Sequence, residues 1–132
     1  MTKPGLTARL WPALSAVLLI AGCATEVQKF PSPTPHAAPE VRLRSVVLVR
    51  NVEVELPTSY KRLLKQGSTW TYVGNIPQGE VFRPDSDVLT VEGSHVHEAY
   101  LVISASRLVG FYLPVEKAFS PLHNQPHILF TQ

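Results

Sequence analysis

Two histidines separated by one residue are the feature of this chain best suited to chemistry. In the run His95-Val96-His97-Glu98, side chains 95 and 97 would point to the same face of a strand. Two imidazoles on one face could bind a single zinc, copper or nickel ion. Glu92, His123 and His127 are candidates for a third ligand. Hydrogen-bonded surface histidines are the simpler interpretation, so we expect no cofactor and keep His95 and His97 as metal-ligand candidates.

A hydrolase would need a nucleophile, a general base and an orienting acid. Ser94 precedes His95, but the residues before Ser94 do not complete the G-x-S-x-G pattern of a nucleophile turn. Asp85 and Asp87 flank a serine after Pro84, and an acidic proline turn explains them without catalysis. The sequence also has no Gly-rich phosphate loop, paired cysteine motif or dinucleotide fingerprint. We therefore expect that the protein is not an enzyme.

Cys23 is the only cysteine, and the residues before it have the composition of an export signal. Lys3 and Arg9 precede an apolar run over residues 10–20, and the small residues Ala21 and Gly22 come directly before the cysteine. A basic start, a short apolar run and small residues at the cut are typical of a secretory signal. The run is much shorter than the roughly 20 residues that a membrane-spanning helix needs.

The tetrapeptide Ile20-Ala21-Gly22-Cys23 resembles the lipobox of bacterial lipoproteins, a resemblance that covers residues 1–23. It implies that a signal peptide, residues 1–22, is removed. It also implies that the Cys23 thiol takes a diacylglyceryl group and that its new amine receives a fatty acyl chain such as palmitate. Ala24, rather than Asp, implies transfer to the outer membrane in a Gram-negative host. We therefore expect an outer-membrane lipoprotein, anchored at Cys23 and facing the periplasm. An ordinary secretory signal is the alternative.

The charge balance argues against a nucleic-acid partner. The chain has 12 Lys and Arg against 10 Asp and Glu, but Lys3 and Arg9 belong to the signal. The mature chain would therefore carry equal numbers of basic and acidic residues. Such a neutral chain lacks the excess positive charge that binding to a phosphate backbone requires.

Proline content predicts a boundary between the anchor and the folded part. Residues 23–40 would form the lipidated N-terminus and a Pro-rich linker, because Pro31, Pro33, Pro35 and Pro39 favour an extended, polyproline-II-like tether. A ligand for a proline-binding module is the alternative. Residues 41–132 would form one small β domain.

The pattern of residues 41–132 predicts an all-β fold. Residues 42–56 alternate between apolar and polar side chains, and Pro57 ends the run. Residues 59–67 form the only plausible helical turn, with Gly67 as its stop. Further strands are expected at 69–76, 80–83, 88–92, 95–103, 108–113 and 127–131. Most of the aromatic side chains should lie in the core, namely Trp70, Tyr72, Phe82, Tyr100, Phe111, Tyr112 and Phe119.

Short strands joined by Gly and Pro turns predict a small antiparallel barrel or sandwich of five to seven strands. The spacing of Gly67, Trp70, Gly74 and Gly79 resembles bacterial SH3-like barrels over about a fifth of the chain, which implies such a barrel. The expected function is that of a noncatalytic, membrane-anchored envelope lipoprotein whose periplasmic β domain binds a protein or peptidoglycan. The alternative is a metal-binding accessory lipoprotein that uses His95 and His97.

Overall fold

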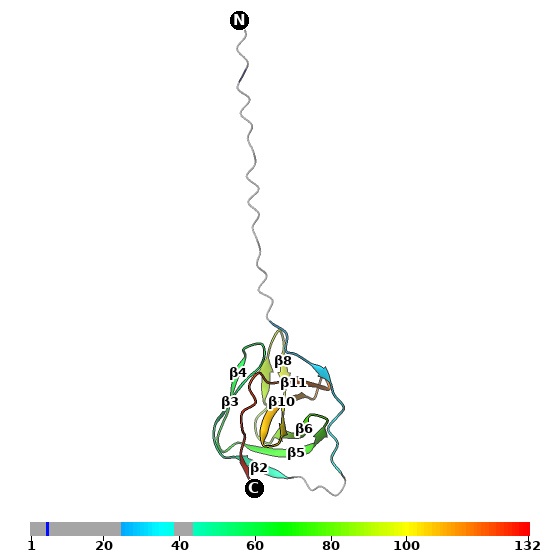
Figure 1. Cartoon of the computed structure of the whole chain (residues 1–132), viewed down its shortest axis with the longest axis vertical. Helices are drawn as coiled ribbons and strands as arrows, with labels where there is room; N and C mark the ends of the chain where they lie inside the picture. The colour runs from blue at the N-terminus through cyan, green and yellow to red at the C-terminus, as the bar shows by residue number, and fades with distance from the viewer. Residues whose placement is uncertain (1–4, 6–24, 39–43) are drawn as a thin grey trace.

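The computed structural model describes Gly5, residues 25–38 and residues 44–132 (Figure 1). The predicted signal peptide, residues 1–22, and Cys23 lie outside this part of the chain, Gly5 excepted. The described residues form twelve β-strands and no helix, so none of them forms an apolar helix that could cross a bilayer. All paired strands run antiparallel. The predicted all-β, antiparallel class is confirmed.

Eight strands form one sheet in the order β1-β11-β10-β9-β6-β5-β2-β12, and two separate ribbons, β3-β4 and β7-β8, complete the fold. The sheet is open, with β1 and β12 at its edges, so the described fold is a sandwich-like arrangement and not a closed barrel. The number of strands exceeds the predicted five to seven. The strands are β1 Phe30–Pro31, β2 Ser45–Leu48, β3 Val52–Glu55, β4 Lys61–Leu64, β5 Thr69–Ile76, β6 Gly79–Pro84, β7 Thr90–Glu92, β8 Val96–Glu98, β9 Tyr100–Ser104, β10 Arg107–Leu113, β11 Ala118–Pro121 and β12 Phe130–Thr131.

Two of the predicted strands are each divided between the main sheet and a ribbon. The alternating run 42–56 contains both β2, in the main sheet, and β3, in the first ribbon. The chain bends between them at Arg50, the one residue that interrupts the alternation. Its apolar side chains are buried as predicted: Val46, Leu48, Val52, Val54 and Leu56. The run 95–103 likewise contains β8, in the second ribbon, and β9, in the main sheet, on either side of Ala99.

The helical turn predicted for residues 59–67 is wrong. Residues Lys61–Leu64 are β4, which pairs with β3 in the register Val54↔Arg62 and Val52↔Leu64. Leu64 is buried in the core, whereas Leu63 is half exposed. This alternation is that of a strand, and burial of Leu64 against the sheet outweighs the local preference for helix.

The core lies on both faces of the main sheet. The larger cluster joins side chains of β2, β5, β6, β9 and β10 to side chains of both ribbons. The smaller cluster occupies the opposite face and contains Val81, Val102, Tyr112 and Phe119. The aromatic residues predicted for the core are buried, except that Tyr100 is partly exposed.

Residues 25–38, here called the N-terminal strap, pack against the domain, so the linker predicted for residues 23–40 is wrong over this part. Val27 is 1% exposed and belongs to the core. Phe30 and Pro31 pair with β11, and His36 exchanges two backbone hydrogen bonds of 3.0 Å with Asn75 of β5. Proline is compatible with this pairing because it is tolerated in edge strands. Figure 1 shows the strap, in blue and cyan, along one side of the domain.

Gly74 allows the strap to approach β5 closely. Its φ is +138°, and a Cβ at this position would lie 2.7 Å from the backbone N and C atoms of His36. Real Cβ atoms do not approach backbone so closely, so only glycine fits here. The folded unit therefore includes the strap and begins well before residue 41.

Candidate functional site

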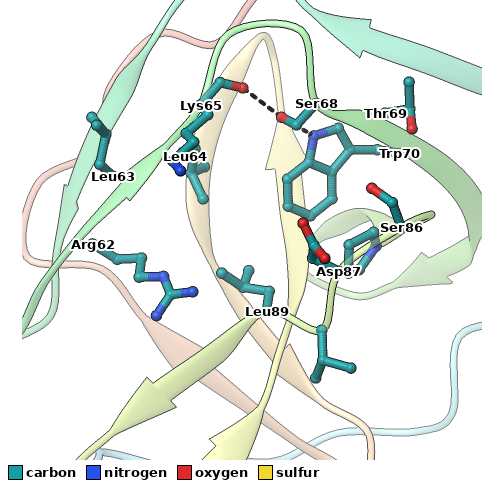
Figure 2. Close-up of a pocket in the computed structure, with 12 residues that line it drawn as sticks. Arg62, Leu63, Leu64, Lys65, Ser68, Thr69, Trp70, Ser86, Asp87 and Leu89 are labelled. Carbon is teal, nitrogen blue, oxygen red and sulfur yellow. Dashed lines mark hydrogen bonds between the residues drawn. The ribbon is translucent and has the colours of Figure 1, made fainter.

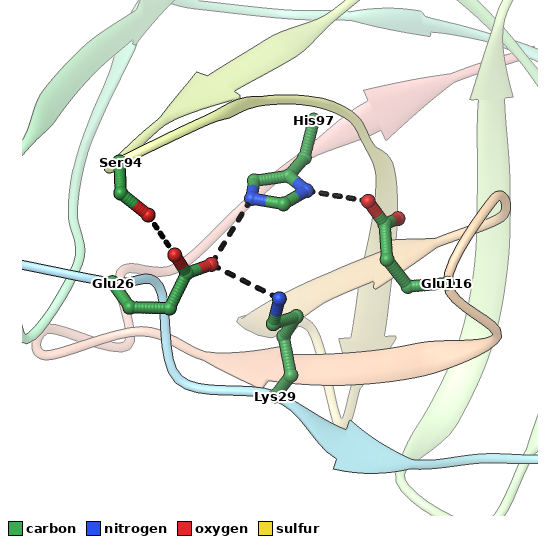
Figure 3. Close-up of polar contacts among 5 residues, drawn as sticks. All are labelled: Glu26, Lys29, Ser94, His97 and Glu116. Atoms are coloured by element: carbon green, nitrogen blue, oxygen red, sulfur yellow. Dashed lines mark hydrogen bonds and ion pairs between the residues drawn. The ribbon is translucent and has the colours of Figure 1, made fainter.

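Five polar side chains from three distant parts of the chain meet where the strap begins (Figure 3). Glu26 and Lys29 come from the strap, Ser94 and His97 from the β7-β8 hairpin, and Glu116 from the turn between β10 and β11. These five residues are called the polar cluster below. The cluster connects the strap to the rest of the fold through side chains, in addition to the backbone pairing of β1.

His97 is the buried centre of the polar cluster. Its neighbour Val96 is 65% exposed, and because side chains alternate along β8, the imidazole of His97 points inward and is only 4% exposed. Its Nδ1 lies 2.5 Å from Oε1 of Glu116, and its Nε2 lies 3.4 Å from Oε1 of Glu26. The Nε2 contact lacks hydrogen-bond geometry. A buried polar ring is costly unless it has partners, and Glu116 supplies one at Nδ1.

Glu26 connects the strap to both the histidine and the hairpin. Its carboxylate lies 3.0 Å from Nζ of Lys29 and accepts a hydrogen bond from the Ser94 hydroxyl. The hydrogen bond from Lys29 lowers the pKa of Glu26, with smaller contributions from the charge on Lys29 and from the two nearby histidines. Desolvation of the carboxylate by neighbouring groups opposes this lowering of the pKa, although Glu26 is exposed. Glu26 is therefore ionised at neutral pH and holds the strap through charge-assisted contacts.

His95 and His97, the two candidate metal ligands, have different environments. Their ring centroids are 6.5 Å apart, but His95 is exposed, whereas His97 is buried against Glu116. Of the predicted third ligands, His123 donates a backbone hydrogen bond to Glu55, and His127 forms a bridge with Arg107. Within the described residues, no three His, Cys, Asp or Glu side chains are arranged to hold a metal ion. Metal binding by His95 and His97 stays a prediction.

The serine and aspartate considered for catalysis have other partners. Ser94 donates its hydrogen bond to Glu26, not to a histidine. Asp85 accepts hydrogen bonds from the hydroxyls of Thr71 and Ser45. These contacts join the turn after β6 to β5 and β2, which is a structural role.

A surface groove runs between β4 and the segment that leads into β7 (Figure 2). We call it the β4 groove; its volume is about 170 Å³. Buried Leu64, Trp70 and Leu89 contribute apolar surface, and exposed Leu63 and Val88 stand at its sides. The indole of Trp70 is held by a 3.0 Å hydrogen bond to the Ser68 hydroxyl. Charged side chains from both sides also line the groove: Arg62, Lys65 and Asp87.

The backbone of β4 is open on the side that faces away from β3. Leu56 donates a 2.9 Å hydrogen bond to the carbonyl of Tyr60, which marks 56 and 60 as a hydrogen-bonded pair. Hydrogen-bonded pairs alternate along an antiparallel ladder, so Arg62 and Leu64 bond to β3, whereas Lys61 and Leu63 direct their N–H and C=O groups outward. An outward row of this kind is able to pair with another extended chain.

No known protein family, curated protein or solved structure matches this chain. The polar cluster and the β4 groove are therefore interpreted from their own chemistry. Sequence patterns singled out His97 but missed its partners, because Glu26 lies in the segment assigned to a linker and Glu116 in an unremarkable turn. No local pattern marks residues that meet only through tertiary packing.

Proposed function

We propose that this chain is a noncatalytic lipoprotein of the bacterial envelope, held at the outer membrane by acyl chains on Cys23. Its β domain binds a protein or cell-wall partner in the periplasm. The sequence Ile20-Ala21-Gly22-Cys23 supports the anchor, since it has the small residues and the cysteine that lipoprotein processing uses.

The observation that carries the proposal is where the fold begins relative to Cys23. Val27, four residues after Cys23, is already 1% exposed within the core. A cut before Cys23 would therefore remove residues 1–22 and leave every strand of the described residues intact. The acylated residue would lie at the very edge of the folded domain.

The anchor can be tested by labelling growing cells with radioactive palmitate. The wild-type protein should take up label and fractionate with the outer membrane. The Cys23→Ser variant should take up none, because serine lacks the nucleophilic thiol that receives the lipid. A Cys23→Ser variant that matures and fractionates like the wild type would contradict the anchor.

The β4 groove supports a binding role for the domain. It combines apolar side chains with charged ones, and exposed Leu63 lies on a strand whose backbone is open to pairing. Pockets that join apolar walls to a few polar groups are typical of binding sites, and an open strand edge can accept an extended peptide. We place the envelope partner at this groove.

A photo-crosslinking side chain introduced at Leu63 tests this placement in intact cells. We expect one discrete crosslinked product with an envelope protein or a peptidoglycan fragment. The same crosslinker at Val49, which is similarly exposed and lies beyond β2, is the matched control. Identical products from the two positions, or none from Leu63, would contradict a partner at the β4 groove.

A further inference from the structure

We infer that the domain lies directly on the lipid surface, through the end where the strap begins. This surface, called the N-terminal face, consists of residues 25–30, the tip of the β7-β8 hairpin at 93–97 and the turn at 114–117. Its ligand is a phospholipid bilayer with anionic headgroups. The inference rests on the proposed function, because it requires acyl chains on Cys23.

The first argument is the length of chain between the anchor and the fold. Only Ala24 and Thr25 separate Cys23 from Glu26. Because an extended chain spans at most about 3.6 Å per residue, Cys23 lies within roughly 11 Å of Glu26. The proline-rich strap lies beyond this point and is packed on the domain, so it cannot act as a spacer.

Side-chain contacts hold the strap to the domain at Glu26. Its carboxylate contacts Lys29, Ser94 and His97, and the following side chain, Val27, is buried. A Cβ on Gly93 would lie 2.8 Å from Cγ2 of Val27, which shows how tightly the hairpin covers the strap. The acyl chains are therefore fixed to one particular face of the domain.

The third argument is the presence of exposed apolar side chains on this face. Val115 is 76% exposed, Val96 is 65% exposed and Phe30 is 53% exposed. Val96 and Val115 each precede a member of the polar cluster, and those members, His97 and Glu116, are in contact at 2.5 Å. Apolar side chains gain free energy on entering the boundary between headgroups and acyl chains.

The charges of the N-terminal face also suit a lipid surface. Lys29, Pro31 and Lys117 line a groove together with Glu116 and Ala118. The carboxylate of Glu116 is bound to His97, and Lys29 is paired with Glu26 at 3.0 Å, so Lys117 is the lysine of this groove that is able to face lipid phosphates. Basic residues near a membrane are attracted to anionic headgroups.

Two acidic residues next to the hairpin, exposed Glu92 on β7 and Glu98 on β8, have no ion pair with another described residue. Phe30, Val96 and Val115, together with Lys117, give the N-terminal face the apolar and basic chemistry of a membrane contact.

The test uses the full lipoprotein, purified from membranes and reconstituted into vesicles of phosphatidylcholine and phosphatidylglycerol. Val96→Cys, Val115→Cys and Val49→Cys each add one thiol, which is labelled with a polarity-sensitive maleimide dye. Val49 is exposed and directly follows β2, the strand that Figure 1 shows at the end of the domain opposite β8. Lipids that carry a nitroxide report contact with the bilayer by quenching the dye.

We expect nitroxide lipids to reduce emission at positions 96 and 115 by about twofold or more, with a blue shift, and to leave position 49 unchanged. Equal quenching at all three positions, or none at 96 and 115, would overturn the inference while leaving the anchor in place. Wild-type protein should take up no dye, because the Cys23 sulfur is in a thioether. Dye on the wild-type protein would instead show a free Cys23 thiol, and both the anchor and the inference would fail.

Discussion

At the scale of single residues, His97 is the buried side chain at the centre of the polar contacts between the strap and the rest of the domain. It is buried, and it stands between Glu116, which belongs to the turn after β10, and Glu26, which belongs to the strap. Hydrogen bonds between a buried group and a charged partner are stronger than those between neutral groups. Removing the imidazole would also take away the side chain that lies between the carboxylates of Glu26 and Glu116.

We predict that His97→Ala lowers the free energy of unfolding by about 1.5–3 kcal/mol, the usual value for a hydrogen bond to a charged group. His95→Ala, on the exposed neighbour, should change it by less than about 0.5 kcal/mol. Urea unfolding of the two variants beside the wild type measures both effects. Equal effects of the two substitutions would show that His97 does not hold the strap.

A second prediction concerns the pH dependence that Glu26 produces. Its pKa is lowered below the usual 4.5, chiefly by the hydrogen bond from Lys29. A carboxylate whose pKa is lower in the folded state stabilises the fold above its unfolded pKa, and that contribution is lost as the pH falls through the folded pKa. Glu26→Gln should therefore lower Tm at neutral pH, and its deficit should shrink as the pH falls below about 4.5.

Thermal unfolding from about pH 7 to about pH 3 checks this expectation. Glu92→Gln, on the same side of the domain, corrects for the loss of one negative charge. A deficit for Glu26→Gln that stays constant over the whole range would contradict the proposed role of its ionised carboxylate.

At the scale of elements, the local pattern predicted most of the longer strands but missed β1, β4 and β11, and it did not predict which strands share a sheet. Thr69–Ile76 is a strand with the predicted bounds, because its alternating β-branched and aromatic side chains pack on both faces of the sheet. The division of residues 42–56 into β2 and β3 could not be predicted, since alternation continues when a chain leaves one sheet for another. Arg50 was the only local sign of that corner.

The strap was missed for a related reason. Its prolines favour extended backbone, and an extended segment that is solvated has the same local pattern as one that is paired at a sheet edge. What distinguishes the two is tertiary: Val27 enters the core, and His36 pairs with Asn75. The partners of His97 were hidden in the same way, because Glu26 and Glu116 reach the histidine only after folding.

The contact between the strap and β5 gives a prediction at this scale. Gly74→Ala should destabilise the fold more than Gly67→Ala does. Both glycines have positive φ, but a Cβ on Gly67 meets nothing within 4 Å, whereas one on Gly74 meets the His36 backbone. Gly67→Ala should cost about 1–2 kcal/mol from backbone strain alone.

Hydrogen exchange locates the effect. In Gly74→Ala, the amides of His36 and Asn75, which donate to each other's carbonyls, should exchange faster, whereas Gly67→Ala should leave them protected. Similar stability and similar protection in the two variants would contradict a close approach of the strap to β5.

At the scale of the whole molecule, the proposed lipoprotein combines a lipid anchor, a strap packed on the domain and a β domain with a groove on its surface. The prolines predicted a spacer, but the strap is packed on the domain and cannot act as one. The acyl chains would therefore hold one face of the domain against the bilayer. The β4 groove is lined by β4 and the segment leading to β7, whereas Thr25 of the strap borders a separate pocket with residues 58–60, which directly precede β4.

Lipidation of Cys23 is tested most directly by the intact mass of the protein extracted from outer membranes. The account predicts a chain that begins at Cys23 and carries a diacylglyceryl group and one further acyl chain. A mass that includes residues 1–22, or one that corresponds to an unmodified Cys23, would contradict it.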